Sequence, residues 1–250
     1  MDPFRYSDTL FTIRDDIVAA NRKTWKRIAH AGSWWTGAER IAIAAETRNA
    51  RSCQLCRERK QALSPGAVQG EHDGGITTAL PPAAVDTVHR IVTDQSRLSR
   101  EWLETLAPAG LSDGHYVELL GVVVGVVSID AFHGALDLPP EPLPAPIPGA
   151  PSGYRPPGLR VDEAWVPMLG SSPSDSAERD LFPPIPQVPN VLRAMSLVPD
   201  AVRSLNELSA AYYLDVLDIA DPSASGNRAI SRPQIELIAA RVSALNECFY

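Results

Sequence analysis

Three cysteines are the residues of this 250-residue chain with the clearest capacity for chemistry. Cys53 and Cys56 form a C-x-x-C pair, and Cys248 lies close to the C-terminal end of the sequence. So few cysteines, so unevenly spaced, do not make the disulfide framework of a small secreted protein. In a reducing compartment a C-x-x-C pair more often performs redox or metal chemistry. The pair therefore indicates a thiol redox site, half of a zinc site, or two small buried residues.

The residues around the C-x-x-C pair favour a reactive thiolate. Asn49 and Ser52 precede Cys53 and predict a helix break, which would place both sulfurs in the first turn of a new helix. Free N–H groups and the positive end of the helix dipole favour a thiolate there. Four basic residues nearby would act in the same direction: Arg51, Arg57, Arg59 and Lys60.

The histidines give a weaker signal than the cysteines. A zinc ion at the pair would need two further ligands, and His72 is the one candidate nearby in the sequence, at a spacing typical of no zinc motif. His30, His72 and His89 lie in charged or loop-like stretches, where a solvated imidazole is the ordinary outcome. We therefore predict no metal ligands.

Apolar residues recur at helical spacing along most of the chain, whereas alternating strands joined by two-residue hairpin turns are missing. The pattern predicts an all-α protein. The expected helices cover residues 10–31, 37–63 with a break near 51–52, 83–93, 100–106, 113–136, 191–217 with a break at Pro199, and 232 onward.

A proline-rich stretch divides the chain. Prolines are dense between residues 139 and 189, where they cannot continue a helix and favour extended backbone. We expect an N-terminal helical half over residues 1–138, a connector over 139–189, and the start of an incomplete C-terminal helical half over 190–250. Six apolar or aromatic residues of the connector are candidates to anchor it to a core: Tyr154, Trp165, Val166, Met168, Leu181 and Phe182.

A weak internal repeat relates the two halves. Both Thr36 and Ser231 begin a capping box, in which a hydroxyl and a side chain three residues later satisfy free N–H groups. Each lies 17 residues before a cysteine, so that 36–53 and 231–248 align without a gap and Ile43 pairs with Ile238. We interpret the halves as diverged copies.

The C-terminal segment carries the most specific motif. Glu236 and Cys248 are separated by eleven residues. This segment resembles the active-site motif of the alkylhydroperoxidase-D-like, or carboxymuconolactone decarboxylase, family, in which a Glu is followed after eleven residues by C-x-x-C-x-x-x-H. The resemblance implies that Cys248 is a resolving cysteine and Glu236 part of a proton relay. The sequence stops where the second cysteine and the histidine would follow, so we expect a longer natural protein.

When the family's cysteine motif is aligned with Cys53 and Cys56 of the first half, the resemblance implies that Cys56 attacks peroxide and that Cys53 resolves the sulfenic acid. The family's glutamate falls on Ile41 and its histidine on Lys60, so its proton relay is not preserved there. The apolar stretch 111–133 is similar to the family's core helix beside the cysteines.

Three other residues are candidates to replace the relay. Glu39 and Glu46 precede the cysteines on the same predicted helix, and His133 could reach in from the apolar helix. Each glutamate also has a structural explanation, because Glu39 fits a helix cap and Glu46 a solvated charge.

Composition and charge limit the classes of partner that we expect. A formal net charge of −7 opposes tight binding to a phosphate backbone. The longest apolar run, 119–129, is shorter than the roughly 20 residues of a membrane-crossing helix, and the polar opening residues do not resemble a signal peptide. We therefore expect a cytoplasmic protein that binds neither nucleic acid nor a membrane.

These observations combine into one expectation, an all-α bundle of the alkylhydroperoxidase-D-like type that acts as a thiol peroxidase or disulfide oxidoreductase. The resemblance implies a small-molecule peroxide, an external dithiol reductant and a homo-oligomer, and it requires no cofactor. Two alternatives stay open. One is a non-catalytic assembly module of the same fold, and the other is a cysteine-independent enzyme similar to carboxymuconolactone decarboxylases.

Overall fold

The computed structural model describes residues 3–7, 9–73, 79–171, 178–182, 185, 188–246 and 248. Over these residues the regular secondary structure is helical, and the only β pairing is a single antiparallel bridge between Arg160 and Met168. The predicted all-α class is therefore confirmed. The α-helices are α1 (Asp15–Ala29), α2 (Gly37–Asn49), α3 (Gln54–Gln61), α4 (Pro82–Thr93), α5 (Arg100–Glu104), α6 (Asp113–Ala135), α7 (Asn190–Ala194), α8 (Pro199–Tyr212), α9 (Val216–Ala220) and α10 (Arg232–Leu245).

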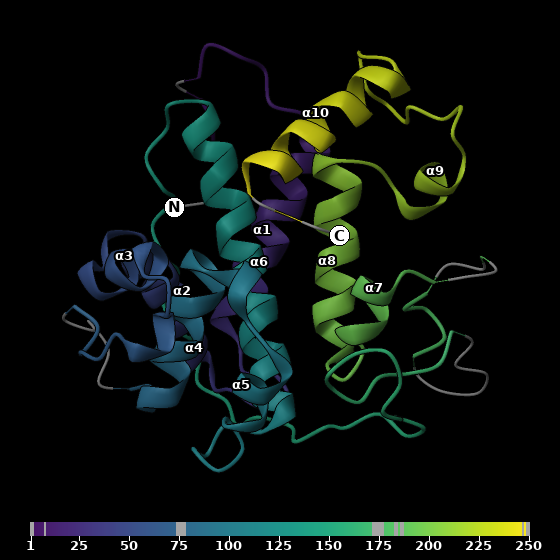
Figure 1. The fold of residues 1–250 in the computed structure, drawn as a ribbon. Helices are drawn as coiled ribbons and strands as arrows, with labels where there is room; N and C mark the ends of the chain where they lie inside the picture. Colours follow the sequence, from purple (N-terminus) through teal and green to yellow (C-terminus); the bar gives the residue numbers. More distant parts are fainter. Residues whose placement is uncertain are drawn as a thin grey trace.

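The apolar helix α6 runs through the middle of the molecule, with α2 and α4 on one side and α8 on the other (Figure 1). Val122, Val126 and Ile129 of α6 are buried in the main hydrophobic cluster, which also contains residues of α1, α2, α4 and α8. By length and composition alone α6 could cross a membrane, but the buried core helix of a soluble protein often has the same length and composition. Here 56% of its most apolar 18-residue stretch is buried inside the molecule. Helix α6 thus organises the core.

Two glycines let neighbouring helices approach α6 closely. A Cβ added to Gly121 would lie 3.0 Å from the Cβ of Ala201 on α8, and one added to Gly125 would lie 3.0 Å from Cγ2 of Thr24 on α1. Both distances are tighter than an ordinary carbon contact, so larger side chains would push the helices apart. The absence of a side chain at Gly121 and Gly125 therefore permits this close packing.

The predicted break between two helices is also present. Helix α2 begins with a reciprocal cap, in which Glu39 N–H donates to the Thr36 hydroxyl and Thr36 N–H donates to the Glu39 carboxylate at 2.8 Å. It ends at Asn49, a 3₁₀ turn covers Ala50–Ser52, and α3 begins at Gln54. This break places the C-x-x-C pair at the start of α3.

The segment after α3 folds back over the start of that helix. Gly70 lies against Leu55 of α3, where an added Cβ would come within 3.0 Å of the leucine Cδ1. The Asp73 carboxylate accepts a hydrogen bond of 2.6 Å from Gln54 N–H, one of the free donors of the first turn. The loop around residues 70–73 is therefore fixed beside the cysteines.

The described parts of the connector pack along the helices. Trp25 Nε1 on α1 donates to the carbonyl of Pro142, and Ile147 N–H donates to the carbonyl of Ala29 at the end of α1. A second hydrophobic cluster joins the connector to α7 and α8. Four of the six predicted anchors are buried in this region, namely Val166, Met168, Leu181 and Phe182, whereas Tyr154 and Trp165 are 41% and 46% exposed.

The C-terminal region is divided between core and surface. Leu208 and Ala211 of α8 belong to the same cluster as the N-terminal helices, so residues from both predicted halves share one core. Helix α10 crosses the end of the bundle, at the top of Figure 1, and Ile235 is its one buried residue. The two cysteine segments therefore lie in different surroundings.

Candidate functional site

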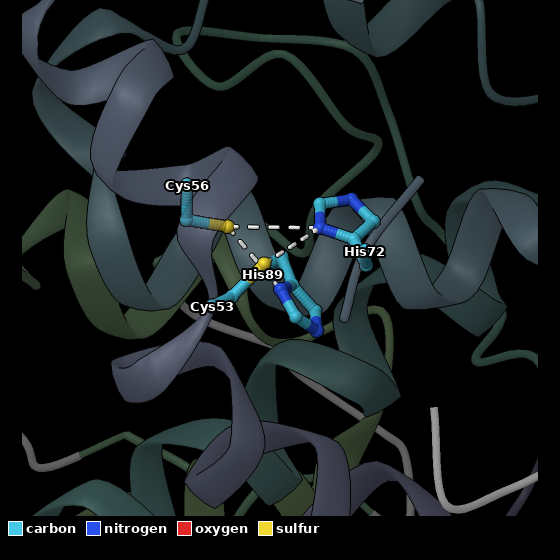
Figure 2. Close-up of side chains that lie close together, drawn as sticks. All are labelled: Cys53, Cys56, His72 and His89. Carbon is cyan, nitrogen blue, oxygen red and sulfur yellow. Dashed lines mark hydrogen bonds between the residues drawn. The ribbon is translucent and has the colours of Figure 1, made fainter. Parts of the chain in front are cut away.

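Four side chains from three segments converge at the start of α3 (Figure 2). Cys53 immediately precedes α3, Cys56 lies in its first turn, His72 comes from the following loop and His89 from α4. The two sulfurs and one nitrogen of each imidazole all lie within 4.8 Å of one another. Cys53, Cys56 and His89 are buried and His72 is partly buried, so the group is largely shielded from water.

Each sulfur contacts an imidazole nitrogen. Cys56 Sγ lies 3.2 Å from Nδ1 of His89 and 3.7 Å from Nδ1 of His72, and Cys53 Sγ lies 3.5 Å from the same His72 nitrogen. The two imidazole rings approach within 3.9 Å between centroids. His72 thus bridges both sulfurs, whereas His89 faces Cys56.

A carboxylate holds the far nitrogen of each imidazole. His89 Nε2 lies 3.1 Å from Oε2 of Glu46, and His72 Nε2 lies 3.0 Å from Oδ1 of Asp86. Because a carboxylate accepts hydrogen bonds, these contacts place a proton on Nε2 of both rings and turn Nδ1 toward the sulfurs. The orientation of both histidines is therefore set from outside the cluster.

The two histidines differ in protonation. Burial, the largest influence on each, lowers both pKa values, but the Asp86 carboxylate and the two thiols more than offset it at His72 and raise the pKa of His72 to about 10. Burial prevails at His89, whose pKa lies below its usual value although Glu46 opposes this. At neutral pH His72 is therefore a cation that donates to the sulfurs, and His89 is a neutral base facing Cys56.

The Cys53 thiol is shifted toward the thiolate. Burial alone would raise its pKa, but backbone N–H donors from Asp73 and Cys56, together with the His72 side chain, hold the pKa below its usual value. This agrees with the expected direction and with a first-turn N–H group as one cause, but the basic residues are not among the causes. Arg57 binds the Ser52 carbonyl and Gln54, and Arg59 binds Asp86 at 2.6 Å, instead of the thiols.

The three candidate relay residues have different roles. Glu46 is fully buried and bound to His89, so its interpretation as a solvated charge is wrong. Glu39 caps α2, as its alternative explanation predicted. His133 lies outside the cysteine cluster, because its two nitrogens contact the Tyr6 hydroxyl at 3.0 Å and the Pro139 carbonyl at 2.7 Å. Of the three, the structure brings Glu46 alone to the site.

The C-terminal candidates also lie outside the cluster. Glu236 accepts hydrogen bonds from the Tyr213 hydroxyl at 2.7 Å and from Arg232 Nε at 2.5 Å, contacts that hold the beginning of α10. Cys248 is exposed, and its backbone N–H donates to the carbonyl of Ser243. The structure therefore does not bring the Glu236–Cys248 motif to the first cysteine pair.

His72 and His89 were predicted to be solvated imidazoles, and this prediction is wrong. A signal for His89 was present, because it shares α4 with the buried residues Ala84 and Val88 and so lies on a packed helix. His72 carried no such local pattern, since its position depends on the loop that Asp73 fixes against α3.

Comparisons of this chain with models of protein families, with curated proteins and with solved structures gave no match. The geometry of the four-residue cluster therefore carries the functional argument. Two adjacent thiols, a neutral base, a cation and two orienting carboxylates provide the groups needed for thiol redox chemistry.

Proposed function

We propose that this chain is a dithiol redox protein, a thiol peroxidase or disulfide oxidoreductase, in which Cys56 attacks and Cys53 resolves. The observation that carries the proposal is a buried series of side-chain contacts, in which Glu46 contacts His89 at 3.1 Å and His89 contacts Cys56 at 3.2 Å. This arrangement gives a thiol a base, and gives the base an orienting carboxylate.

The first step forms a sulfenic acid. His89 Nδ1 takes the proton of the Cys56 thiol, and the resulting thiolate attacks one peroxide oxygen. The O–O bond breaks, and the leaving alkoxide takes the proton back from His89 to become an alcohol. Glu46 acts as a positioning residue, because it holds His89 with Nδ1 toward the sulfur and stabilises the imidazolium that forms.

The second step forms the disulfide. Cys53, whose pKa is lowered, attacks the sulfenic sulfur of Cys56 as a thiolate. The sulfenic oxygen leaves as hydroxide, which takes one proton to become water, and a Cys53–Cys56 disulfide remains. An external dithiol then restores both thiols by exchange and is itself oxidised to a disulfide. The proximity of the two sulfurs, within 4.8 Å, supports this step.

The resemblance to the alkylhydroperoxidase-D-like family supports the same assignment of roles to the two cysteines. In that family a glutamate and a histidine relay protons from motif positions held here by Ile41 and Lys60. Glu46 and His89 supply the same two residue types from other positions, with direct contact to each other and to Cys56. The loss of the family's own relay positions is thereby compensated.

Peroxide consumption at the expense of a small dithiol tests this function. We expect the wild-type chain to consume an organic hydroperoxide, and Cys56→Ser to abolish the activity. Because general base catalysis contributes about 10²- to 10⁴-fold, His89→Gln should slow sulfenic acid formation by about 100-fold or more. Glu46→Gln should cost about tenfold, and its pH–rate profile should shift because His89 loses the carboxylate that favours its charged form.

Two variants distinguish resolution from attack and supply the control. Cys53→Ser should still react once with peroxide and accumulate a sulfenic acid on Cys56 that a dimedone probe labels. Cys248→Ser removes the exposed cysteine outside the cluster and should retain wild-type kinetics. Reaction of the wild-type thiols at the rate of free cysteine would reject the function and leave a non-catalytic module.

A further inference from the structure

We propose that Cys53, Cys56, His72 and His89 bind one Zn²⁺ ion in the reduced protein. The inference goes beyond the proposed redox function and does not depend on it, because it concerns metal binding by the reduced side chains. Among the described residues this is the one group of three or more histidine, cysteine and carboxylate side chains whose ligand atoms gather within 4.8 Å.

The separations of the ligand atoms fit a tetrahedral zinc ion. With Zn–S bonds of about 2.3 Å and Zn–N bonds of about 2.05 Å, tetrahedral angles separate a sulfur from a nitrogen ligand by about 3.5 Å. The contacts of the sulfurs with Nδ1 measure 3.2 Å for Cys56 to His89, 3.5 Å for Cys53 to His72, and 3.7 Å for Cys56 to His72. Two sulfurs and two nitrogens complete the four ligands of a closed, structural zinc site.

The contacts of the far nitrogen of each imidazole are those expected of a metal-binding histidine. A histidine that binds a metal usually donates its other N–H to a carboxylate or carbonyl, which fixes the ring and raises its basicity. Here Glu46 holds Nε2 of His89 and Asp86 holds Nε2 of His72. Asp86 is itself bound by Arg59 at 2.6 Å and by Arg90 at 2.7 Å. Both imidazoles are therefore held with Nδ1 toward the shared centre.

Charge and softness select the ion. Thiolate and imidazole ligands favour zinc over magnesium or calcium, which prefer oxygen ligands. Two thiolates balance the two charges of Zn²⁺, so a bound ion leaves a neutral group in a site where Cys53 and His89 have no exposed surface. Because zinc binds thiolates and neutral imidazoles, its affinity for this site should rise with pH.

Zinc and a disulfide exclude each other at this site, because both use the same sulfurs. Together with the proposed redox function, this predicts release of the ion on oxidation. The two thiolates give two electrons to the peroxide, two protons complete the alcohol and water, and a disulfide and free Zn²⁺ remain.

Metal titration of the reduced, untagged chain tests the site. The probes are Zn²⁺ in competition with a chromophoric chelator, and Co²⁺, whose absorption reports tetrahedral geometry and thiolate ligation. We expect one ion per chain and a tetrahedral cobalt spectrum with thiolate charge transfer. Asp86→Asn should weaken zinc binding by about 10- to 100-fold. Cys53→Ser and His72→Gln, each lacking a ligand, should weaken it further.

Matched variants outside the cluster control for general effects. Cys248→Ser and His30→Gln remove a cysteine and a histidine and should leave the stoichiometry and affinity unchanged, with helical content followed by circular dichroism. Absence of stoichiometric binding, an octahedral cobalt spectrum, or equal binding by Cys53→Ser would overturn the zinc site. Disulfide formation without zinc binding would refute only this inference, whereas zinc binding with unreactive thiols in the chelator-treated chain would refute only the redox function.

Discussion

The segments that end at Cys53 and at Cys248 begin alike and end in different environments. In both, a capped helix start lies 17 residues before a cysteine, and the predicted caps are present at Thr36 and at Ser231. Yet Cys53 is fully buried beside a second cysteine and two histidines, whereas Cys248 is exposed. Local sequence determines the beginning of a helix, but the packing of that helix determines what its cysteine can do.

The contrast begins with one aligned pair of isoleucines. Ile43 on α2 is 0% exposed within the main core, and its counterpart Ile238 on α10 is 56% exposed. The position that aligns with Glu46 differs as well, since Arg241 stands there. The α10 segment therefore lacks both the packing that buries the first site and the carboxylate that orients His89.

The largest difference is expected in folding stability. Ile43→Ala should lower the free energy of unfolding by about 2–5 kcal/mol, because it leaves a cavity in a packed core. Ile238→Ala should change it by less than about 0.5 kcal/mol, since that side chain is mostly in water. Urea denaturation of both variants measures the two values. Similar losses would mean that α10 is packed as tightly as α2, contrary to the comparison.

The second largest difference is expected in the accessibility of Cys248 compared with Cys53 and Cys56. In the reduced, chelator-treated chain a maleimide should alkylate Cys248 at least about 100-fold faster than Cys53 and Cys56, because the buried pair reacts with a bulky reagent only after local opening. Mass spectrometry at timed intervals identifies each alkylated cysteine. Equally fast labelling of all three would show that the pair is open to bulky reagents and would remove the contrast.

The two helix caps should differ by a smaller amount. Thr36→Ala should cost about 1 kcal/mol, because α2 is part of the core and loses a hydroxyl acceptor for the Glu39 N–H. Ser231→Ala should cost less than about 0.5 kcal/mol in global stability, because α10 has one buried residue and can fray without unfolding the rest. Calorimetry provides both values, and a larger cost at Ser231 would indicate that α10 folds together with the core.

The smallest effect is expected at low pH, where α10 alone should lose local stability. Hydrogen bonds from Tyr213 and Arg232 hold the pKa of Glu236 below its usual value. Its stabilising contribution is therefore present above the ordinary glutamate pKa of 4.5 and is lost as pH falls through the lower folded value. Amide hydrogen exchange, corrected for its intrinsic pH dependence, should show α10 loosening over that range. Glu236→Gln should remove this dependence, and an unchanged acid response in the variant would assign it to other groups.

Helical periodicity and capping residues predicted most of the fold. The break after Asn49 and the helix over 113–136 were predicted to within a few residues, because local hydrogen bonding and apolar spacing determine them. The start of the first helix was predicted too early. Leu10 and Phe11 fit the apolar pattern but are exposed, and α1 begins at Asp15, whose acidic side chain suits a first turn.

The site was predictable in part. The C-x-x-C pair and the helix start beneath it follow from adjacent residues. The lowered pKa of Cys53 follows from them only in part, because Asp73 and His72 contribute to it as well. His72 and His89 lie 16 and 33 positions after Cys56 and reach it through the loop that Asp73 fixes and through the packing of α4. No local pattern encodes such tertiary contacts, and the resemblance to a known motif directed attention to Glu236 and His133 instead.

The most direct test of the central claim is a disulfide map of the reduced chain after treatment with one equivalent of hydroperoxide. Proteolysis and mass spectrometry after alkylation of the remaining thiols would identify the partners. We predict rapid loss of two thiols as a Cys53–Cys56 disulfide, with Cys248 recovered in its alkylated form. Persistence of all three thiols at the rate of free cysteine, or a disulfide that includes Cys248, would contradict it.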